Sequence, residues 1–135
     1  MTVTIPENKL DLLQRPIVCT LVTIMPDGMP QATPVWFSYD GTDVWVNSAK
    51  GRQKDINMRE RPDKVAVLVV DPENPYRYLE IRGKVIEITE DGALDHINRL
   101  AKAYFGRDEF YSGRSADLRG KETRVIYKIK PMHVN

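Results

Sequence analysis

Residues 78–88 have the sequence Tyr78-Leu79-Glu80-Ile81-Arg82-Gly83-Lys84-Val85-Ile86-Glu87-Ile88, and this stretch decides the fold that we expect. The apolar residues up to Val85 share one face of an extended strand, whereas Ile86 and Ile88 fall on the other face. A period of two that changes phase near Gly83 predicts a β-bulge, or a strand whose two halves contact different neighbours. Both arrangements are typical of barrels and of dimer interfaces.

The segments on either side predict further strands. Runs of apolar and β-branched residues indicate strands at 17–24, 29–39, 43–47, 64–70 and 123–130. Turn residues separate several of them, at Met25-Pro26-Asp27-Gly28, Asp40-Gly41 and Asp71-Pro72. The sequence therefore predicts about six antiparallel strands, most of them joined by hairpins.

Helical patterns are fewer and shorter. Apolar residues recur at i, i+3 and i+4 through Ala93–Phe105, which predicts an amphipathic helix. Shorter helices are expected at Ile5–Leu13 and just before Pro62, and a loop or single helical turn at 112–120. Strands joined by hairpins, with short peripheral helices, favour a mainly β fold with some α, a small antiparallel barrel.

Composition sets the class and the compartment. With 135 residues, 41% hydrophobic and 29% charged, we expect one globular domain over residues 1–135. A net charge of +1 argues against general affinity for nucleic acid. The single cysteine, Cys19, suits a reducing compartment. No signal peptide and no long apolar run is found, so we expect a cytoplasmic protein that does not cross a membrane.

The basic run at 48–57 is the strongest functional signal. It reads Ser48-Ala49-Lys50-Gly51-Arg52-Gln53-Lys54-Asp55-Ile56-Asn57 and lies where a strand leads into a helix. Backbone N–H groups at a helix N-terminus favour anions, so Lys50, Arg52 and Lys54 could bind a phosphate. Asn57 would share a helix face with Lys54. The alternative is a solvent-exposed helix face.

Two aromatic segments could complete such a site. A proline inside the strand Thr33-Pro34-Val35-Trp36-Phe37 is typical of an edge, a bulge or a position facing a ligand. Its two rings could equally belong to the core. The segment Asn74-Pro75-Tyr76-Arg77-Tyr78 could be the start of a strand, or an interface patch, because Tyr and Arg are enriched in interfaces.

Other chemistry finds no support in the sequence. His96 is expected to be solvated on the polar side of its helix, and His133 has no evident partner. Two distant histidines and a cysteine expected to be buried fit no metal site. We find no P-loop, nucleophile elbow or Ser/His/Asp set. The sequence therefore offers a phosphate site but no catalytic side chain. This combination is typical of a protein that binds a planar, phosphate-bearing redox cofactor, because such a cofactor carries the reactive atom.

The order of these motifs resembles a known family. Asp27-Gly28-Met29-Pro30, Thr33 to Phe37, Gly41, Ser48 to Asn57, Tyr78 to Gly83 and the ending Arg124 to Val134 are similar to the pyridoxamine-phosphate-oxidase-like flavin and deazaflavin oxidoreductases, in particular the coenzyme F420-dependent branch. The similarity covers nearly the whole chain. It implies a split β-barrel of the FMN-binding type, a homodimer with cofactor sites between subunits.

The resemblance also implies a set of cofactor-binding residues. Arg52, Lys54 and Asn57 would hold the cofactor phosphate, with Lys50 and Gly51 nearby. Thr33, Pro34, Val35, Trp36, Ser48 and Ala49 would line the ring, and Tyr76, Arg77 and Tyr78 would come from the partner subunit. Arg77 could also bind tail carboxylates of F420. The vitamin B6 oxidases have a longer basic C-terminal signature that this sequence lacks. Its absence argues against vitamin B6 as the substrate.

Three functions remain open at this point. The leading hypothesis is an F420-dependent reductase that acts on a small electron-poor organic acceptor. The first alternative is an FMN-dependent reductase or oxidase on the same scaffold. The second alternative is a protein that binds a flavin or deazaflavin without catalysis. No sequence motif identifies the acceptor.

Overall fold

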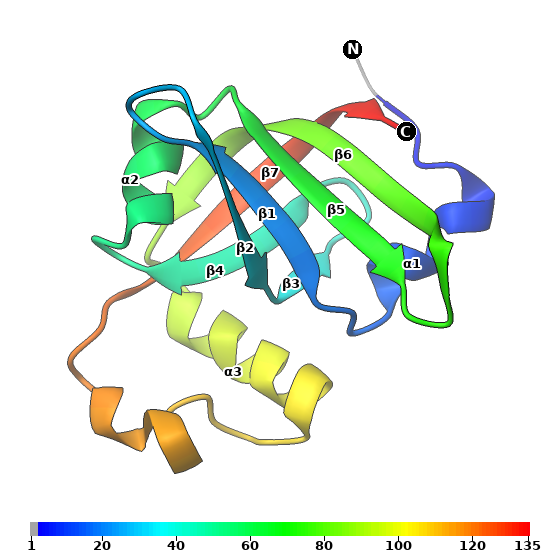
Figure 1. Ribbon diagram of the computed structural model, residues 1–135. Helices are drawn as coiled ribbons and strands as arrows, with labels where there is room; N and C mark the ends of the chain where they lie inside the picture. The colour runs from blue at the N-terminus through cyan, green and yellow to red at the C-terminus, as the bar shows by residue number, and fades with distance from the viewer. Residues whose placement is uncertain (1–2) are drawn as a thin grey trace.

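One curled antiparallel sheet dominates the computed structural model, which describes residues 3–135 (Figure 1). Within that range the sheet has seven strands in the spatial order β2-β1-β5-β6-β7-β4-β3. The strands are β1 (Cys19–Ile24), β2 (Pro30–Val35), β3 (Phe37–Tyr39), β4 (Val44–Ala49), β5 (Val65–Asp71), β6 (Asn74–Thr89) and β7 (Arg124–Val134). The helices are the 3₁₀ helix η1 (Glu7–Lys9), α1 (Asp11–Gln14), α2 (Gln53–Glu60), α3 (Ala93–Phe105) and the 3₁₀ helix η2 (Gly113–Leu118).

The two edges of the sheet are neighbours in the chain. β2 pairs with β1 at one edge and β3 pairs with β4 at the other, yet only Trp36 separates β2 from β3. The sheet therefore curls until its edges approach each other at Trp36, which makes a split barrel. The single strand expected at 29–39 is wrong in this respect, and the division explains why there are seven strands rather than about six.

The phase change expected in the 78–88 stretch is confirmed. β6 pairs with both β5 and β7, and its register against β7 shifts between Arg82 and Gly83 and again between Val85 and Glu87. Gly83 leaves no room for a side chain between β6 and β7. A Cβ atom at this position would lie 2.6 Å from Ile129 Cγ2 and 2.8 Å from the Lys130 carbonyl oxygen.

The core fills the inside of the barrel. Alternate residues of β5 and β7 point inward, including Val67 and Tyr127, and Leu12 of α1 closes one end. Cys19 is buried as expected, and burial raises the pKa of its thiol to about 12, which makes it unreactive. Helix α3 has the bounds predicted from its spacing, whereas the expected helix at Ile5–Leu13 is divided into η1 and α1.

Helices α2 and α3 lie outside the barrel near the end of β4 (Figure 1). Helix α2 contacts β1 and β4, and α3 contacts β4 and β7. The basic run at 48–57 therefore spans the junction from the end of β4 to the first half of α2. No helix of residues 3–135 is both long and apolar enough to cross a membrane.

Candidate cofactor-binding site

The basic run forms a tight junction between β4 and α2. Ser48 and Ala49 belong to β4, where they pair with Val125 and Arg124 of β7. Gly51 then has a φ of 92°, a left-handed conformation that glycine adopts without strain. Its N–H donates a hydrogen bond to Asp55 Oδ2 (2.9 Å). The junction is therefore fixed from within the chain.

The N-terminus of α2 remains open. Arg52 occupies the N-cap position in an extended conformation, and its side chain makes no capping hydrogen bond. The first N–H groups of a helix lack partners inside the helix and carry partial positive charge. This end of α2 therefore has donors available for an anion.

A pocket of about 120 Å³ adjoins this end of α2. It brings together β2, β4 and α2 of the predicted site with residues from the C-terminal third of the chain. The lining residues are Pro34, Val35, Trp36, Asn47, Ser48, Arg52, Lys54, Ile97, Phe110 and Arg124. The two sequence segments that we expected to form one site thus share one cavity.

Two polar groups of this pocket lack partners. Ser48 Oγ is buried, and no hydrogen-bond partner for it exists among residues 3–135. Lys54 is half-buried, and within the described part of the chain no carboxylate pairs with it. Burial lowers the pKa of Lys54 below its ordinary value, and the charges of Arg52 and Arg124 lower it further. An anion here would relieve that repulsion.

The neighbouring basic residues are already paired. Arg52 donates to Glu122 (2.7 Å), and Lys50 pairs with Glu90 (3.1 Å). Lys50 does not line the pocket. The structure therefore distinguishes Lys54 from the other two basic residues of the run, which the sequence could not do.

Asn57 has a different environment from the one expected. Its side chain is fully buried (0% exposed) and donates to Thr23 Oγ1 (3.0 Å) on β1. It also accepts hydrogen bonds from Gln53 (2.7 Å) and Arg61 (3.1 Å). These contacts attach α2 to the barrel, so Asn57 supports the helix that carries Lys54.

A buried polar chain behind the pocket was not expected from the sequence. Arg124 donates through Nε to Asn47 Oδ1 (2.9 Å), and its guanidinium lies over the Phe110 ring at 5.0 Å. Asn47 Nδ2 contacts the Ala93 carbonyl oxygen (2.9 Å) and His96 Nδ1 (3.1 Å). Arg124 is thus a buried cation of the site, held by Asn47 of β4 and paired with Glu122 (3.4 Å).

The expectation that His96 is solvated is wrong. The side chain is 2% exposed, and burial lowers its pKa to about 4, helped by the charges of Arg99 and Arg124. The burial of His96 could have been predicted from its spacing, because it lies three residues after Ala93 and four before Leu100, both of them buried. It therefore shares the apolar face of α3.

Trp36 lies at the opening between the two sheet edges. Its ring stacks on Tyr104 of α3 (centroids 5.2 Å apart) and meets Phe110 edge-on. Trp36 is half-buried and lines the pocket, whereas Phe37 is buried in the core. Because β2 pairs with β1 alone, the backbone of Thr33 to Val35 has a free edge beside Trp36.

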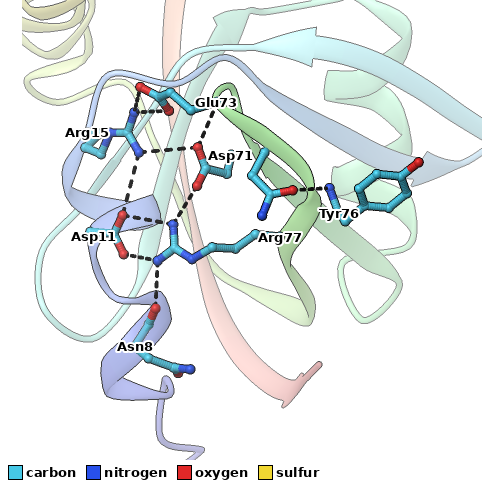
Figure 2. A network of polar contacts seen from close by, with 8 residues as sticks. Asn8, Asp11, Arg15, Asp71, Glu73, Tyr76 and Arg77 are labelled. Carbon is cyan, nitrogen blue, oxygen red and sulfur yellow. Dashed lines mark hydrogen bonds and ion pairs between the residues drawn. The ribbon is translucent and has the colours of Figure 1, made fainter.

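The third predicted segment lies elsewhere in the molecule. Residues 74–78 begin β6, as one interpretation of this segment predicted, and in Figure 1 the β5–β6 hairpin and α2 are on opposite sides of the barrel. Figure 2 shows the Arg77 guanidinium directed at Asp11 and Asp71. Hydrogen bonds to these two carboxylates raise the pKa of Arg77 above its ordinary value. The Tyr76 ring points away from this cluster and is 92% exposed.

Among residues 3–135, no group of three or more His, Cys, Asp or Glu side chains could hold a metal ion.

The fold and the pocket define a split β-barrel with a candidate anion site at a strand–helix junction. The model of the pyridoxamine 5'-phosphate oxidase family matches residues 5–135. The chain therefore belongs to this family, which confirms the resemblance noted from the sequence and supports an oxidoreductase function.

Solved structures agree with this assignment. A protein named F420 reductase is 37% identical, with a TM-score of 0.83 over 97% of this chain and 98% of that one. A conserved hypothetical protein of Mycobacterium tuberculosis is 25% identical (TM-score 0.71, 98% and 84%). A Listeria innocua protein provisionally named pyridoxamine 5'-phosphate oxidase is 23% identical (TM-score 0.67, 96% and 94%) and supports the fold alone. No curated protein matched the sequence.

Proposed function

We propose that this chain is an F420-dependent reductase that transfers a hydride between the deazaflavin and a small electron-poor organic acceptor. One observation carries the cofactor assignment. Among residues 3–135, Lys54 has no carboxylate partner and Ser48 Oγ has no hydrogen-bond partner, and both line one pocket beside the uncapped N-terminus of α2. Unpaired donors and positive charge at a helix N-terminus are what a bound phosphate requires.

The available donors fit a phosphate of a flavin or deazaflavin side chain. Lys54 would supply the charge, and the open N–H groups of α2 would supply directed hydrogen bonds. Arg52 and Lys50 would contribute less to binding, because Glu122 and Glu90 already pair with them. Arg124 and Ser48 lie deeper in the same pocket and would contact the part of the cofactor that follows the phosphate.

The pocket wall on the β2 side fits a planar ring. The free edge of Thr33 to Val35 would offer backbone N–H and C=O groups to the polar rim of the ring. Trp36, supported by Tyr104 and Phe110, would provide a flat apolar surface. Gly51 and Ala49 would allow close approach of the cofactor chain to the backbone.

When bound, the deazaflavin supplies the hydride chemistry, and this chain supplies position and electrostatics. Lys54 and the start of α2 would fix the phosphate end. Trp36 and the β2 edge would fix the plane of the ring and exclude water from it. No side chain of the pocket is assigned as a proton donor to the acceptor, and the nearby His96 does not line the pocket.

A homodimer would complete the site. The pocket of one protomer has about 120 Å³, whereas ligand sites usually have roughly 300–1,000 Å³. A second wall is therefore needed, and the exposed Tyr76 and Tyr78 at the start of β6 are suited to contribute it from a partner. Arg77 is held by two carboxylates of its own chain, so it would act mainly by orienting these tyrosines.

The outer face of the sheet offers the contact surface for a second copy. A groove over β1, β5 and β6 is lined by aliphatic residues, among them Val22, Ala66 and Met132, and has a volume of about 510 Å³. Its charged rim carries both signs, including Arg82 and Glu80. Such a face could pair with itself across a two-fold axis.

F420 is preferred to FMN because of the 37% identical structure named F420 reductase. FMN remains the alternative, since both cofactors present a phosphate after a ribityl-type chain. Titration of the purified protein with each cofactor tests the choice. We expect tighter binding of F420, followed by oxidation of reduced F420 when an electron-poor acceptor is added. Tight FMN binding without F420 binding would overturn the cofactor, and F420 binding without turnover across a broad acceptor panel would favour a carrier.

A further inference from the structure

A second cavity lies between α1, β3, β4 and α3 and shares no lining residue with the cofactor pocket. Its volume is about 570 Å³, which lies within the usual range for small-molecule sites of roughly 300–1,000 Å³. The residues that matter for its chemistry are Phe37, Ser38, Tyr39, Trp45, His96, Arg99 and Tyr104. We call this cavity the α3 groove.

The hydrogen bonds behind the groove have a defined direction. Asn47 must orient its amide with Oδ1 toward Arg124 Nε and Nδ2 toward the Ala93 carbonyl oxygen. The reason is that the Arg124 N–H can only donate a hydrogen bond and the carbonyl oxygen can only accept one. Asn47 Nδ2 therefore donates to His96 Nδ1. The proton of the neutral imidazole must then be on Nε2, which donates to Ser38 Oγ (2.9 Å).

This direction leaves one hydrogen-bond donor in the groove without an acceptor. Ser38 Oγ accepts from His96, so its own O–H is free to donate, and no acceptor for it exists within the described range. Ser38 lines the groove. The burial of His96 keeps the imidazole neutral near pH 7, so the direction of the chain holds under ordinary conditions.

The charged groups of the groove favour an anion. Arg99 is exposed and has no ion-pair partner among residues 3–135. Burial is the largest cause of the lowered pKa of His96, and the charge of Arg99 is the next. Arg15 is already bound to Glu73 (2.8 Å). The Asp40 carboxylate also lines the groove, and hydrogen bonds from two backbone N–H groups and from Trp45 Nε1 (2.9 Å) stabilise its negative charge. The two arginines outnumber this one carboxylate among the lining residues.

The walls favour a planar ligand. Four aromatic side chains line the groove, and the polar atoms of three are already bound inside the protein. Tyr104 donates to the Ile17 carbonyl oxygen (2.8 Å), Tyr39 to the Gly41 carbonyl oxygen (2.9 Å) and Trp45 to Asp40. Trp36 already stacks on the Tyr104 ring, and Lys128 Nζ lies over the Trp45 ring at 4.3 Å, so a ligand would contact the ring surface that remains.

We propose that the α3 groove is a second small-molecule site that binds an aromatic carboxylate, with Arg99 pairing with the carboxylate, Ser38 donating to it and the rings of Trp45 and Tyr104 enclosing the aromatic part. This inference does not depend on the identity of the cofactor. It assigns a site to a cavity whose lining residues do not line the cofactor pocket.

The two tryptophans make the proposal testable, because Trp45 lines the α3 groove and Trp36 lines the cofactor pocket. The probe is naphthalene-2-carboxylate, titrated into ¹⁵N-labelled protein while both indole N–H signals are followed by NMR. Trp45→Phe and Trp36→Phe variants assign the signals. We expect a saturable shift of the Trp45 signal, a much smaller shift of the Trp36 signal, and little binding of the neutral naphthalene-2-carboxamide.

Variants then test the two polar contacts. Arg99→Ala should weaken binding roughly tenfold or more, and Ser38→Ala about three- to tenfold. Lys102→Ala is the matched control, since it removes a positive charge from α3 that pairs with Asp108 outside the groove. Ser38→Thr keeps the hydroxyl and should keep the affinity. Unchanged affinity in Arg99→Ala, equal binding of the carboxamide, or shifts confined to Trp36 would each overturn the proposal.

Discussion

Lys54 is the residue on which the proposed cofactor site depends most, and Lys54→Met is the change that tests it. Methionine keeps the apolar stem and removes the charge. Lys54 has no partner to lose within the described chain, and burial together with Arg52 and Arg124 already disfavours its charge. The variant should therefore be as stable as the wild type, to within about 0.5 kcal/mol, or slightly more stable.

The expected loss of affinity follows from the contact that Lys54 would make. A hydrogen bond to a charged group contributes about 1.5–3 kcal/mol, which corresponds to a roughly 10- to 150-fold increase in Kd. A bound phosphate should also raise the pKa of Lys54, which lies below its ordinary value in the free protein. Binding should therefore take up protons at alkaline pH, and affinity should fall as pH rises through the pKa of the free lysine.

Isothermal titration with F420, in buffers of different ionisation enthalpy, measures both the affinity and the proton uptake. Lys50→Met is the matched control, because Lys50 belongs to the same run but pairs with Glu90 and does not line the pocket. The control should lose at most a few-fold in affinity and keep the proton uptake. Equal losses in both variants, or unchanged affinity in Lys54→Met, would refute the assignment of the phosphate to Lys54.

Three further predictions concern the fold and the assembly. The pKa of His96 is lowered from 6.5 to about 4, so the unfolded chain binds more protons, and stability should fall by about 3 kcal/mol as pH drops from 6.5 to 4. Urea unfolding at several pH values measures the free energy of unfolding. In His96→Gln this free energy should not show the decrease between pH 6.5 and 4 that is due to His96. Gly83→Ala should destabilise by roughly 1–3 kcal/mol, since its Cβ would meet Ile129 and Lys130; a change under 0.5 kcal/mol would contradict the close approach of β6 and β7. Val22→Glu, on the outer sheet face, should convert a dimer to a monomer in light scattering, and a wild-type monomer would exclude the dimer.

Local periodicity predicted much of the fold. The spacing of Ala93–Phe105 indicated α3, and the phase change near Gly83 indicated the register shifts of β6, because both depend on residues close in sequence. The division of 29–39 at Trp36 could not be predicted in this way. It depends on which strands β2 and β3 pair with, and those partners are distant in the chain.

The candidate site was only partly visible in the sequence. Glycine and charge at the β4–α2 junction indicated an anion site, but pairing decides which cation is available, and Glu122 and Glu90 come from other elements. Asn47 and Arg124 gave no local signal, because their roles arise from contacts between β4, β7 and α3. His96 did give a signal, since its position on the apolar face of α3 can be read from its spacing.

A crystal structure of the protein with bound F420 would test the central claim most directly. We predict a phosphate within hydrogen-bond distance of Lys54 Nζ and of the first N–H groups of α2, with the ring against Trp36 and the β2 edge. A phosphate bound at another surface, with Lys54 in solvent and the pocket between β2, β4 and α2 free of cofactor, would contradict the account.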